Sequence, residues 1–362
     1  MTSKEFYTQL EIVAEEKGLS LEQLLDAFEK GLINGYKKEF GNSSVRVEFN
    51  VEKHTINMYS RRIVVSSLED RDPESEILPI TLTEAKKISR KAKVGDILEE
   101  AVNIKDFGRL AAGQVKNILN QNIKTYEKEN TYQYFKSLEN EMIGATVIGI
   151  DEKHDNQLVL SIGNGISTLL PRKELLKSDE VNVGDHINVY VSAVELTTKG
   201  PKVYVSRNDK HFVIRLLEQY VSEIHDGIIE IKGIARDAGD RCKIALKSND
   251  PNVEAIGSAV GRDGSRIKDV NNALGGEKID LYEWSDDPKT LVANALKPAE
   301  VIAVINVDPI TKTSLAIVPD DQLSLAIGKK GQNVRLAVQS SGWKIDIKTE
   351  SIAREQGYEW DE

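Results

Sequence analysis

The second half of this 362-residue chain repeats itself, and the repeat constrains the fold more than any other feature. The segment SAVGRDGSRIKDV (258–270) aligns with LAIGKKGQNVRLA (325–337), and GEKIDLYE (276–283) aligns with GWKIDIKT (342–349) after a one-residue shift. Each copy also has an upstream helical segment and two strand-like runs, at 212–220, 227–236 and 241–248 in the first and at 288–296, 300–308 and 313–319 in the second. The pattern predicts tandem domains with the order helix, strand, strand, helix, Gly-x-x-Gly, helix, strand.

A Gly-x-x-Gly loop between two helices is suited to contact with RNA. Glycine lacks Cβ, so a nucleic-acid backbone can approach closely and the chain can take a positive φ. The helix that follows offers unpaired N–H groups and the positive end of its dipole to phosphate. KH domains clamp about four nucleotides with such a loop. A lone Gly-x-x-Gly is more typical of a tight helix corner, but two copies, each followed by a basic amphipathic helix, favour RNA binding by two tandem KH domains of type II.

The candidate RNA-binding residues lie in and just after the two loops. They are Gly261, Arg262, Asp263, Gly264, Arg266 and Lys268 in the first copy and Gly328, Lys329, Lys330, Gly331 and Arg335 in the second. Because Asp263 suits phosphate less well than a basic residue would, we expect the second loop to contribute more charge. Arg236, Arg241 and Lys243 flank the turn between the strands of the first copy, where a second phosphate contact and a solvated strand edge fit the sequence equally well.

The first 130 residues predict a separate α+β domain. Residues 4–40 have the pattern of two helices divided at Gly18, and Ser20 with Gln23 forms a capping box for the second helix. The remaining expected elements are paired strands at 45–51 and 55–68, a helix opened by Thr81 and Glu84, a strand after Asp96, and a long connecting helix that begins near residue 106.

Residues 142–206 contain five short strand-like runs separated by turn residues such as those at 153–156. This spacing predicts a small five-stranded β-barrel of the OB-fold class. The barrel has few aromatic residues for base stacking, so a spacer or partner-docking role is as compatible with it as RNA binding. The predicted architecture is a multidomain α+β protein, divided into 1–130, 131–206, 207–284 and 285–350 with a short tail at 351–362.

Charge and composition narrow the class of protein. The net charge is −10 and no predicted domain is basic overall, so RNA contact must come from small basic clusters rather than from long-range attraction. The single cysteine excludes an internal disulfide, the histidines match no metal spacing, and no phosphate-binding Gly-x4-Gly-Lys loop occurs. No apolar run is long enough to span a bilayer. We therefore expect a cytoplasmic protein that is not an enzyme, binds no cofactor or metal and does not enter membranes.

Several long strings resemble the NusA family of transcription termination and antitermination factors. DFGRLAA (106–112) is similar to the entry to the family's connecting helix, and GPKVYVSR (200–207) is similar to the exit of its S1-type RNA-binding barrel. GIARDAGDRCKIAL (233–246) and LAIGKKGQNVRLA (325–337) resemble its first and second KH domains. Two departures stand out: Ala238 where the family usually has proline, and Asp263 where a basic residue is common.

The resemblance implies a function as well as a fold. It implies that the N-terminal domain docks on RNA polymerase near the RNA exit channel, while the barrel and KH domains follow nascent single-stranded RNA. It also implies a monomer that modulates pausing, aids intrinsic termination and joins antitermination complexes with other Nus factors. The alternative is a free-standing RNA-binding or translation-associated KH protein, which would have no need of the first domain. A phosphorolytic exoribonuclease would need a catalytic core and the opposite domain order.

Overall fold

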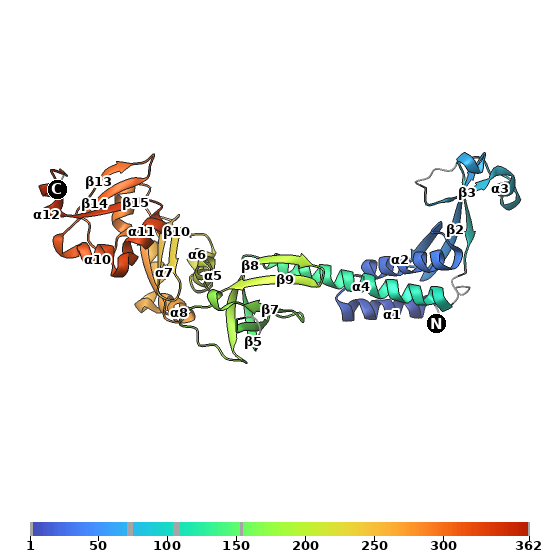
Figure 1. The fold of residues 1–362 in the computed structure, drawn as a ribbon, viewed down its shortest axis with the longest axis horizontal. Coiled ribbons are helices and arrows are strands. Elements are labelled where there is room, and N and C mark those ends of the chain that lie inside the picture. Colours follow the sequence, from blue (N-terminus) through green and yellow to red (C-terminus); the bar gives the residue numbers. More distant parts are fainter. Residues whose placement is uncertain (1–2, 71–74, 104–108, 153–154, 361–362) are drawn as a thin grey trace. The chain divides into compact units, whose positions relative to one another are not determined.

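The computed structural model describes residues 3–70, 75–103, 109–152 and 155–360 (Figure 1). The start of the predicted connecting helix at 106–108 and the first half of the predicted turn at 153–156 lie outside the described residues. The chain forms two compact units. The N-terminal unit comprises Met1–Tyr134 with Leu196–Pro201, and the C-terminal unit comprises Phe135–Glu195 with Lys202–Glu362.

The N-terminal unit has the predicted α+β composition. Its helices are α1 (Ser3–Lys17), α2 (Leu21–Phe40), α3 (Leu82–Ile88) and α4 (Arg109–Ser137), the last continuing into the C-terminal unit. Its strands are β1 (Val45–Asn50), β2 (Thr55–Val65), β3 (Leu78–Thr81) and β4 (Ile97–Ala101), and a short 3-10 turn spans Leu68–Asp70. Strand β2 is central, pairing antiparallel with β1 and β4 and parallel with β3.

Local signals set the helix boundaries of this unit. Gly18 follows α1 with φ of 63°, and the Ser20 hydroxyl accepts from the Gln23 N–H while the Gln23 side chain accepts from the Ser20 N–H. Thr81 caps α3 by accepting from the Glu84 N–H. These predictions are confirmed. Strand β3, a four-residue segment with no clear alternation, was not predicted.

The barrel prediction is also confirmed. Strands β5 (Met142–Asp151), β6 (Gln157–Ser161), β7 (Ser167–Leu170), β8 (His186–Thr197) and β9 (Gly200–Ser206) form one five-stranded sheet in the order β7-β6-β5-β8-β9, and a 3-10 turn spans Arg172–Glu174. Strands β6 and β8 both pair antiparallel with β5, and β7 pairs antiparallel with β6. Inward residues such as Val147, Leu160 and Val189 are at most 1% exposed and fill the interior.

The two predicted repeats have the same topology. The first repeat (207–284) contains α5 (Lys210–Tyr220), α6 (Ser222–His225), β10 (Ile229–Asp237), β11 (Arg241–Ser248), α7 (Ala255–Val260), α8 (Ser265–Ala273) and β12 (Lys278–Glu283). The second repeat (285–350) contains α9 (Pro288–Ala295), β13 (Ala303–Asp308), β14 (Thr313–Val318), α10 (Leu323–Ile327), α11 (Gln332–Ser341) and β15 (Lys344–Thr349). In each, the middle strand pairs antiparallel with the first strand and parallel with the third. The short helix α6 is an addition that the repeat pattern did not predict.

The repeats pack in series. One face of the first repeat's sheet is covered by its own helices, with Cys242, Ile244 and Leu246 in the core. On the opposite face, Ala245 and Tyr282 pack against α9 and α11 of the second repeat. The sheet of the second repeat is covered in turn by α12 (Glu350–Glu355) and the residues after it, through Ala353, Tyr358 and Trp360. Both faces of each sheet are therefore buried, and the tail completes the stack.

Candidate nucleic-acid interface

The two Gly-x-x-Gly loops have nearly the same backbone conformation. Gly261 and Gly328 have φ/ψ of 74°/173° and 75°/170°, and Gly264 and Gly331 have φ of 73° and 71°. An added Cβ at Gly328 would lie 2.7 Å from the backbone nitrogen of Asn333. Glycine is required there for both conformation and space. The sequence match between the loops thus corresponds to one built geometry that occurs twice.

The third residue of each loop is also left-handed. Asp263 has φ of 55° and Lys330 has φ of 54°. Aspartate tolerates this region better than most side chains, because its short polar group can bond locally. Lys330 takes the same conformation, so the departure at Asp263 changes the charge of the first loop and not its backbone.

The second loop presents more charge and more apolar surface than the first. Lys329 and Lys330 are both exposed, directly before the N-terminus of the ten-residue helix α11. On the helix before the loop, Leu325 is 44% and Ile327 is 38% exposed. At the aligned positions the first repeat has Ser258 and Val260, both half-buried. Exposed cations beside an apolar strip offer one surface to phosphates and another to bases.

The basic residues after the loops are already engaged within the protein. Arg266 Nη1 donates to Glu223 Oε2 at 2.7 Å and to the Ser258 carbonyl at 2.8 Å, and Lys268 Nζ donates to the carbonyl of Asp263 at 3.0 Å. Arg335 Nη2 donates to Asp237 Oδ2 at 3.0 Å. These three side chains support the loops and their helices in this structure.

Two of the three residues around the first repeat's strand turn are buried. The Arg236 side chain is 3% exposed and makes a two-pronged ion pair with Glu277, which is 0% exposed. Lys243 is 1% exposed, and its Nζ donates to the carbonyls of Ala295 and Lys297 at 2.8 and 2.6 Å. A solvated strand edge is therefore the wrong interpretation for both, and neither offers its charge to phosphate. Arg241 is partly exposed and pairs with Asp280 at 2.9 Å.

Burial changes the protonation of this region. Desolvation by burial lowers the pKa of Lys243 to about 8, against a smaller opposing effect of the Asp280 carboxylate, and two carbonyls hold the ammonium. Burial likewise raises the pKa of Tyr282 to about 12. The Tyr282 hydroxyl donates to Ser340 Oγ at 2.9 Å, across the junction between the repeats. Both groups serve packing of the repeats against each other.

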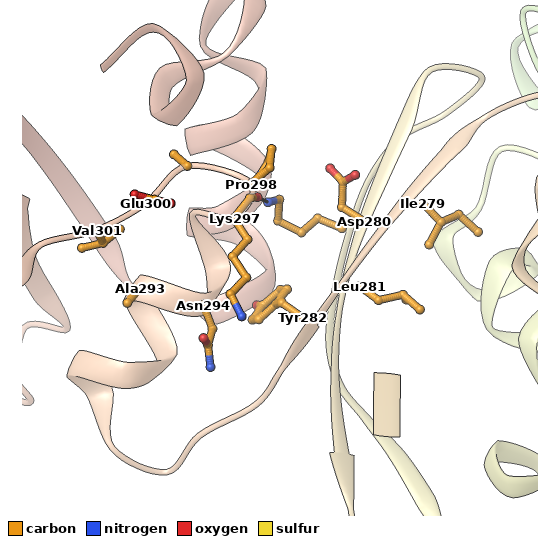
Figure 2. Close-up of a pocket in the computed structure, with 12 residues that line it drawn as sticks. Ile279, Asp280, Leu281, Tyr282, Ala293, Asn294, Lys297, Pro298, Glu300 and Val301 are labelled. Carbon is orange, nitrogen blue, oxygen red and sulfur yellow. Dashed lines mark hydrogen bonds between the residues drawn. The ribbon is translucent and has the colours of Figure 1, made fainter. Parts of the chain in front are cut away.

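A pocket of about 790 Å³ lies at this junction (Figure 2). One wall is β12, through residues 279–282, and the other is the end of α9 with the segment that follows it, through residues 293, 294 and 297–301. Lys243 belongs to the lining, but its ammonium is already bound by two carbonyls. Within the described ranges, no group of three or more His, Cys, Asp or Glu side chains is placed to hold a metal ion. None of the helices in those ranges has the length and apolar character of a membrane span.

Sequence reasoning missed the acidic partners. Glu277, Asp237 and Asp240 all bind basic or amide side chains from elsewhere in the fold. The signal that could have indicated them is the run RDAGD at 236–240, in which charged residues surround a glycine at a strand turn. Nothing local identifies the partners, which are 41 to 98 residues away.

Comparison with known proteins agrees with this architecture. Residues 5–129 match the NusA N-terminal domain, residues 207–284 match the NusA-like first KH domain, and residues 288–355 match the NusA-like second KH domain. The transcription termination/antitermination protein NusA of Bacillus subtilis is 43% identical, over 98% of this chain and 93% of its own length. Its counterparts from Halalkalibacterium halodurans and Thermus thermophilus are 42% and 36% identical, over 99% and 97% of this chain and 92% and 91% of their own lengths.

Proposed function

The chain belongs to the NusA family of transcription termination/antitermination proteins, and from this premise we propose that its N-terminal unit docks on RNA polymerase while its two Gly-x-x-Gly loops hold the nascent transcript. Its function is transcription termination and antitermination, and its two repeats are KH domains. The observation that carries the proposal is the paired loop geometry, in which each loop leads into the N-terminus of a helix.

The loops bind RNA through a small number of contacts. Arg262, Lys329 and Lys330 are exposed at the loops, and each following helix directs unpaired N–H groups toward a bound phosphate. Such contacts are weak one by one in a chain of net charge −10. Tethering to polymerase makes them effective, because it replaces affinity in solution with a high local concentration of the emerging strand.

The alternative of a free-standing RNA-binding protein does not account for the first 130 residues. Most of this segment matches the NusA N-terminal domain, and relatives named as termination/antitermination proteins align with nearly the whole chain. Within the proposal the protein acts in the cytoplasm as a monomer and a non-enzymatic factor, in company with other Nus factors. The divisions at 130, 206 and 284 stay predictions.

The test is single-round transcription by the cognate polymerase on a template that carries a hairpin pause. We expect the protein to lengthen the pause and the double variant Lys329→Asp with Lys330→Asp to lengthen it less. The matched control is Lys289→Asp with Lys312→Asp, which reverses two exposed charges of the second repeat, one on α9 and one in the turn between β13 and β14. An unchanged pause lifetime with the native protein would overturn the proposal.

RNA binding and polymerase binding are then measured separately. In the variant Lys329→Asp with Lys330→Asp, the loss of two phosphate contacts should reduce the slope of log Kd against log salt concentration by about 1.4 for single-stranded RNA. Residues 1–128 should co-elute with polymerase, and the loop variant of the full chain should co-elute as the native protein does. An RNA affinity at low salt that is the same for the native and loop-variant proteins would contradict the assignment of the second loop.

A further inference from the structure

We propose that the strand turn of the first repeat at 237–240 positions the second repeat's Gly-x-x-Gly loop for RNA, with Asp237 and Asp240 as positioning residues. The inference rests on the proposed function of the two loops. It assigns to an acidic turn in one KH domain the control of the RNA clamp in the other.

The turn holds the first residue of α11, directly after the second loop. The Gln332 side-chain amide donates to Asp237 Oδ2 at 3.0 Å and to Asp240 Oδ2 at 2.8 Å. One helical turn further on, Arg335 donates to the same oxygen of Asp237 at 3.0 Å. Two carboxylates from the first repeat therefore fix the end of α11 that faces the loop.

The other end of α11 is held by the first repeat as well. An added Cβ at Gly233 on β10 would lie 1.9 Å from the carbonyl oxygen of Ser340, so the helix end sits directly on this strand. Tyr282, 1% exposed on β12, donates its hydroxyl to Ser340 Oγ. Helix α11 is thus fixed at both ends by the neighbouring domain, and the loop before it takes its direction from that domain.

The turn itself is rigidly supported. Arg236 on one side binds Glu277, and the Gly239 N–H donates to the same carboxylate at 2.9 Å. Gly239 has φ of 77°, and a Cβ there would lie 3.0 Å from the backbone nitrogen of Lys177, which belongs to the predicted barrel domain. Residues 236–240 therefore contact the barrel, their own repeat and the second repeat. Such a segment is suited to setting the register between RNA-binding modules.

Charge alone predicts the opposite effect of these two residues. Asp237 and Asp240 place negative charge close to a loop that binds phosphate, so removal of that charge should strengthen the binding of RNA of any length. Positioning predicts a loss instead, confined to RNA that spans both loops. A strand held by two sites in fixed register gains from effective concentration, and this gain falls when the register loosens.

The experiment compares two RNAs on the full chain. Unstructured RNA of adenine and cytosine is used at about 4 nucleotides, the number that one KH groove holds, and at several times that length, so that one strand can occupy both grooves. We expect Asp237→Ala with Asp240→Ala to weaken binding of the long RNA by about tenfold, since the avidity between the sites is reduced. Binding of the short RNA should stay within about twofold, since each groove remains intact. The control, Glu230→Ala with Asp286→Ala, removes two exposed carboxylates elsewhere and should leave the ratio of the two affinities as in the native protein.

Two further variants separate the causes. Asp237→Asn with Asp240→Asn keeps an acceptor for the Gln332 amide and should restore most of the long-RNA affinity. Gly233→Ala perturbs the opposite end of α11 without touching any charge, and should reproduce the loss on long RNA alone. Equal losses on both lengths, no loss, or a gain on both would overturn the inference. Failure of the native protein to bind either RNA would overturn the proposed function and this inference with it.

Discussion

The buried pair between Arg236 and Glu277 allows a quantitative prediction about stability. The Glu277 side chain is 0% exposed and accepts from Arg236 Nε at 2.9 Å, from Nη2 at 2.9 Å and from the Gly239 N–H at 2.9 Å. In Glu277→Ala the guanidinium would stay buried with only the carbonyls of Arg207 and Asp209 as partners. An uncompensated buried charge of this kind costs about 3–5 kcal/mol.

The matched control is an exposed glutamate of the same repeat. Glu230 on β10 pairs with Lys232 at 3.2 Å, and the two side chains are 51% and 31% exposed. Exposed pairs contribute about 0–1 kcal/mol, so Glu230→Ala should leave stability nearly unchanged. Both variants make the same chemical substitution, and they differ in burial and in the number of hydrogen bonds lost.

The assay is urea unfolding of the full chain followed by tryptophan fluorescence. All three tryptophans, Trp284, Trp343 and Trp360, belong to the C-terminal unit, so the signal reports that unit. With a urea slope of about 1–3 kcal/mol per molar, a loss of about 3–5 kcal/mol in Glu277→Ala should lower the midpoint by about 1–5 M. The double variant Arg236→Met with Glu277→Leu should recover part of this loss, because no charge is left buried. A midpoint for Glu277→Ala equal to that of Glu230→Ala would refute the reasoning.

Three other predictions follow from the same region and its neighbours. Burial lowers the pKa of Lys243 from 10.5 to about 8, so between pH 8 and 10.5 the unfolded chain binds more protons than the folded one. The free energy of unfolding of the native protein, relative to that of Lys243→Met, should therefore rise with pH by at most about 3 kcal/mol. An unchanged difference between the two proteins from pH 7 to pH 10 would contradict this. Gly328→Ala should abolish RNA binding by the second loop, because the added Cβ would meet the Asn333 backbone. At Gly331 an added Cβ has open space, so Gly331→Ala costs only about 1–2 kcal/mol of backbone strain. RNA titration of the two variants distinguishes these effects. Deletion of residues 350–362 uncovers an apolar face of the second repeat's sheet, so it should lower the urea midpoint and cause self-association that analytical ultracentrifugation detects. A truncated protein that stays monomeric with native stability would contradict the role of these residues in covering the sheet.

Much of the fold was predictable because its signals are local or periodic. The capping box at Ser20 and Gln23, the cap at Thr81 and the repeated loop all act within a few residues of where they occur. The repeat made the prediction of the two KH domains stronger, because the elements expected in one copy occur in the same order in the other. Helix α6 and strand β3 have four residues each, too few to show a periodicity of their own, and neither lies in a regular series of short strands as the equally short β7 does.

The site was less predictable because strand alternation shows which residues share a face but not what covers that face. Along RCKIALKS (241–248), Cys242 and Ile244 point to one side while Lys243 and Ala245 point to the other. A lysine on the second side indicates solvent when the strand is read alone. The second repeat covers that side, and the Lys243 ammonium instead binds the carbonyls at the end of α9.

The internal use of basic residues explains why the modules are locked together. Arg236, Lys243, Arg266 and Arg335, all singled out as basic groups for RNA, bind carboxylates or carbonyls of the protein in this structure. The charge left for phosphate at the loops is correspondingly small, in a chain whose net charge opposes RNA. A few weak contacts can hold a strand when they act together, and they act together only if the loops keep a fixed register. Under the proposed function, the basic residues that bind carboxylates and carbonyls of the protein therefore build the frame in which the exposed loop residues act on RNA.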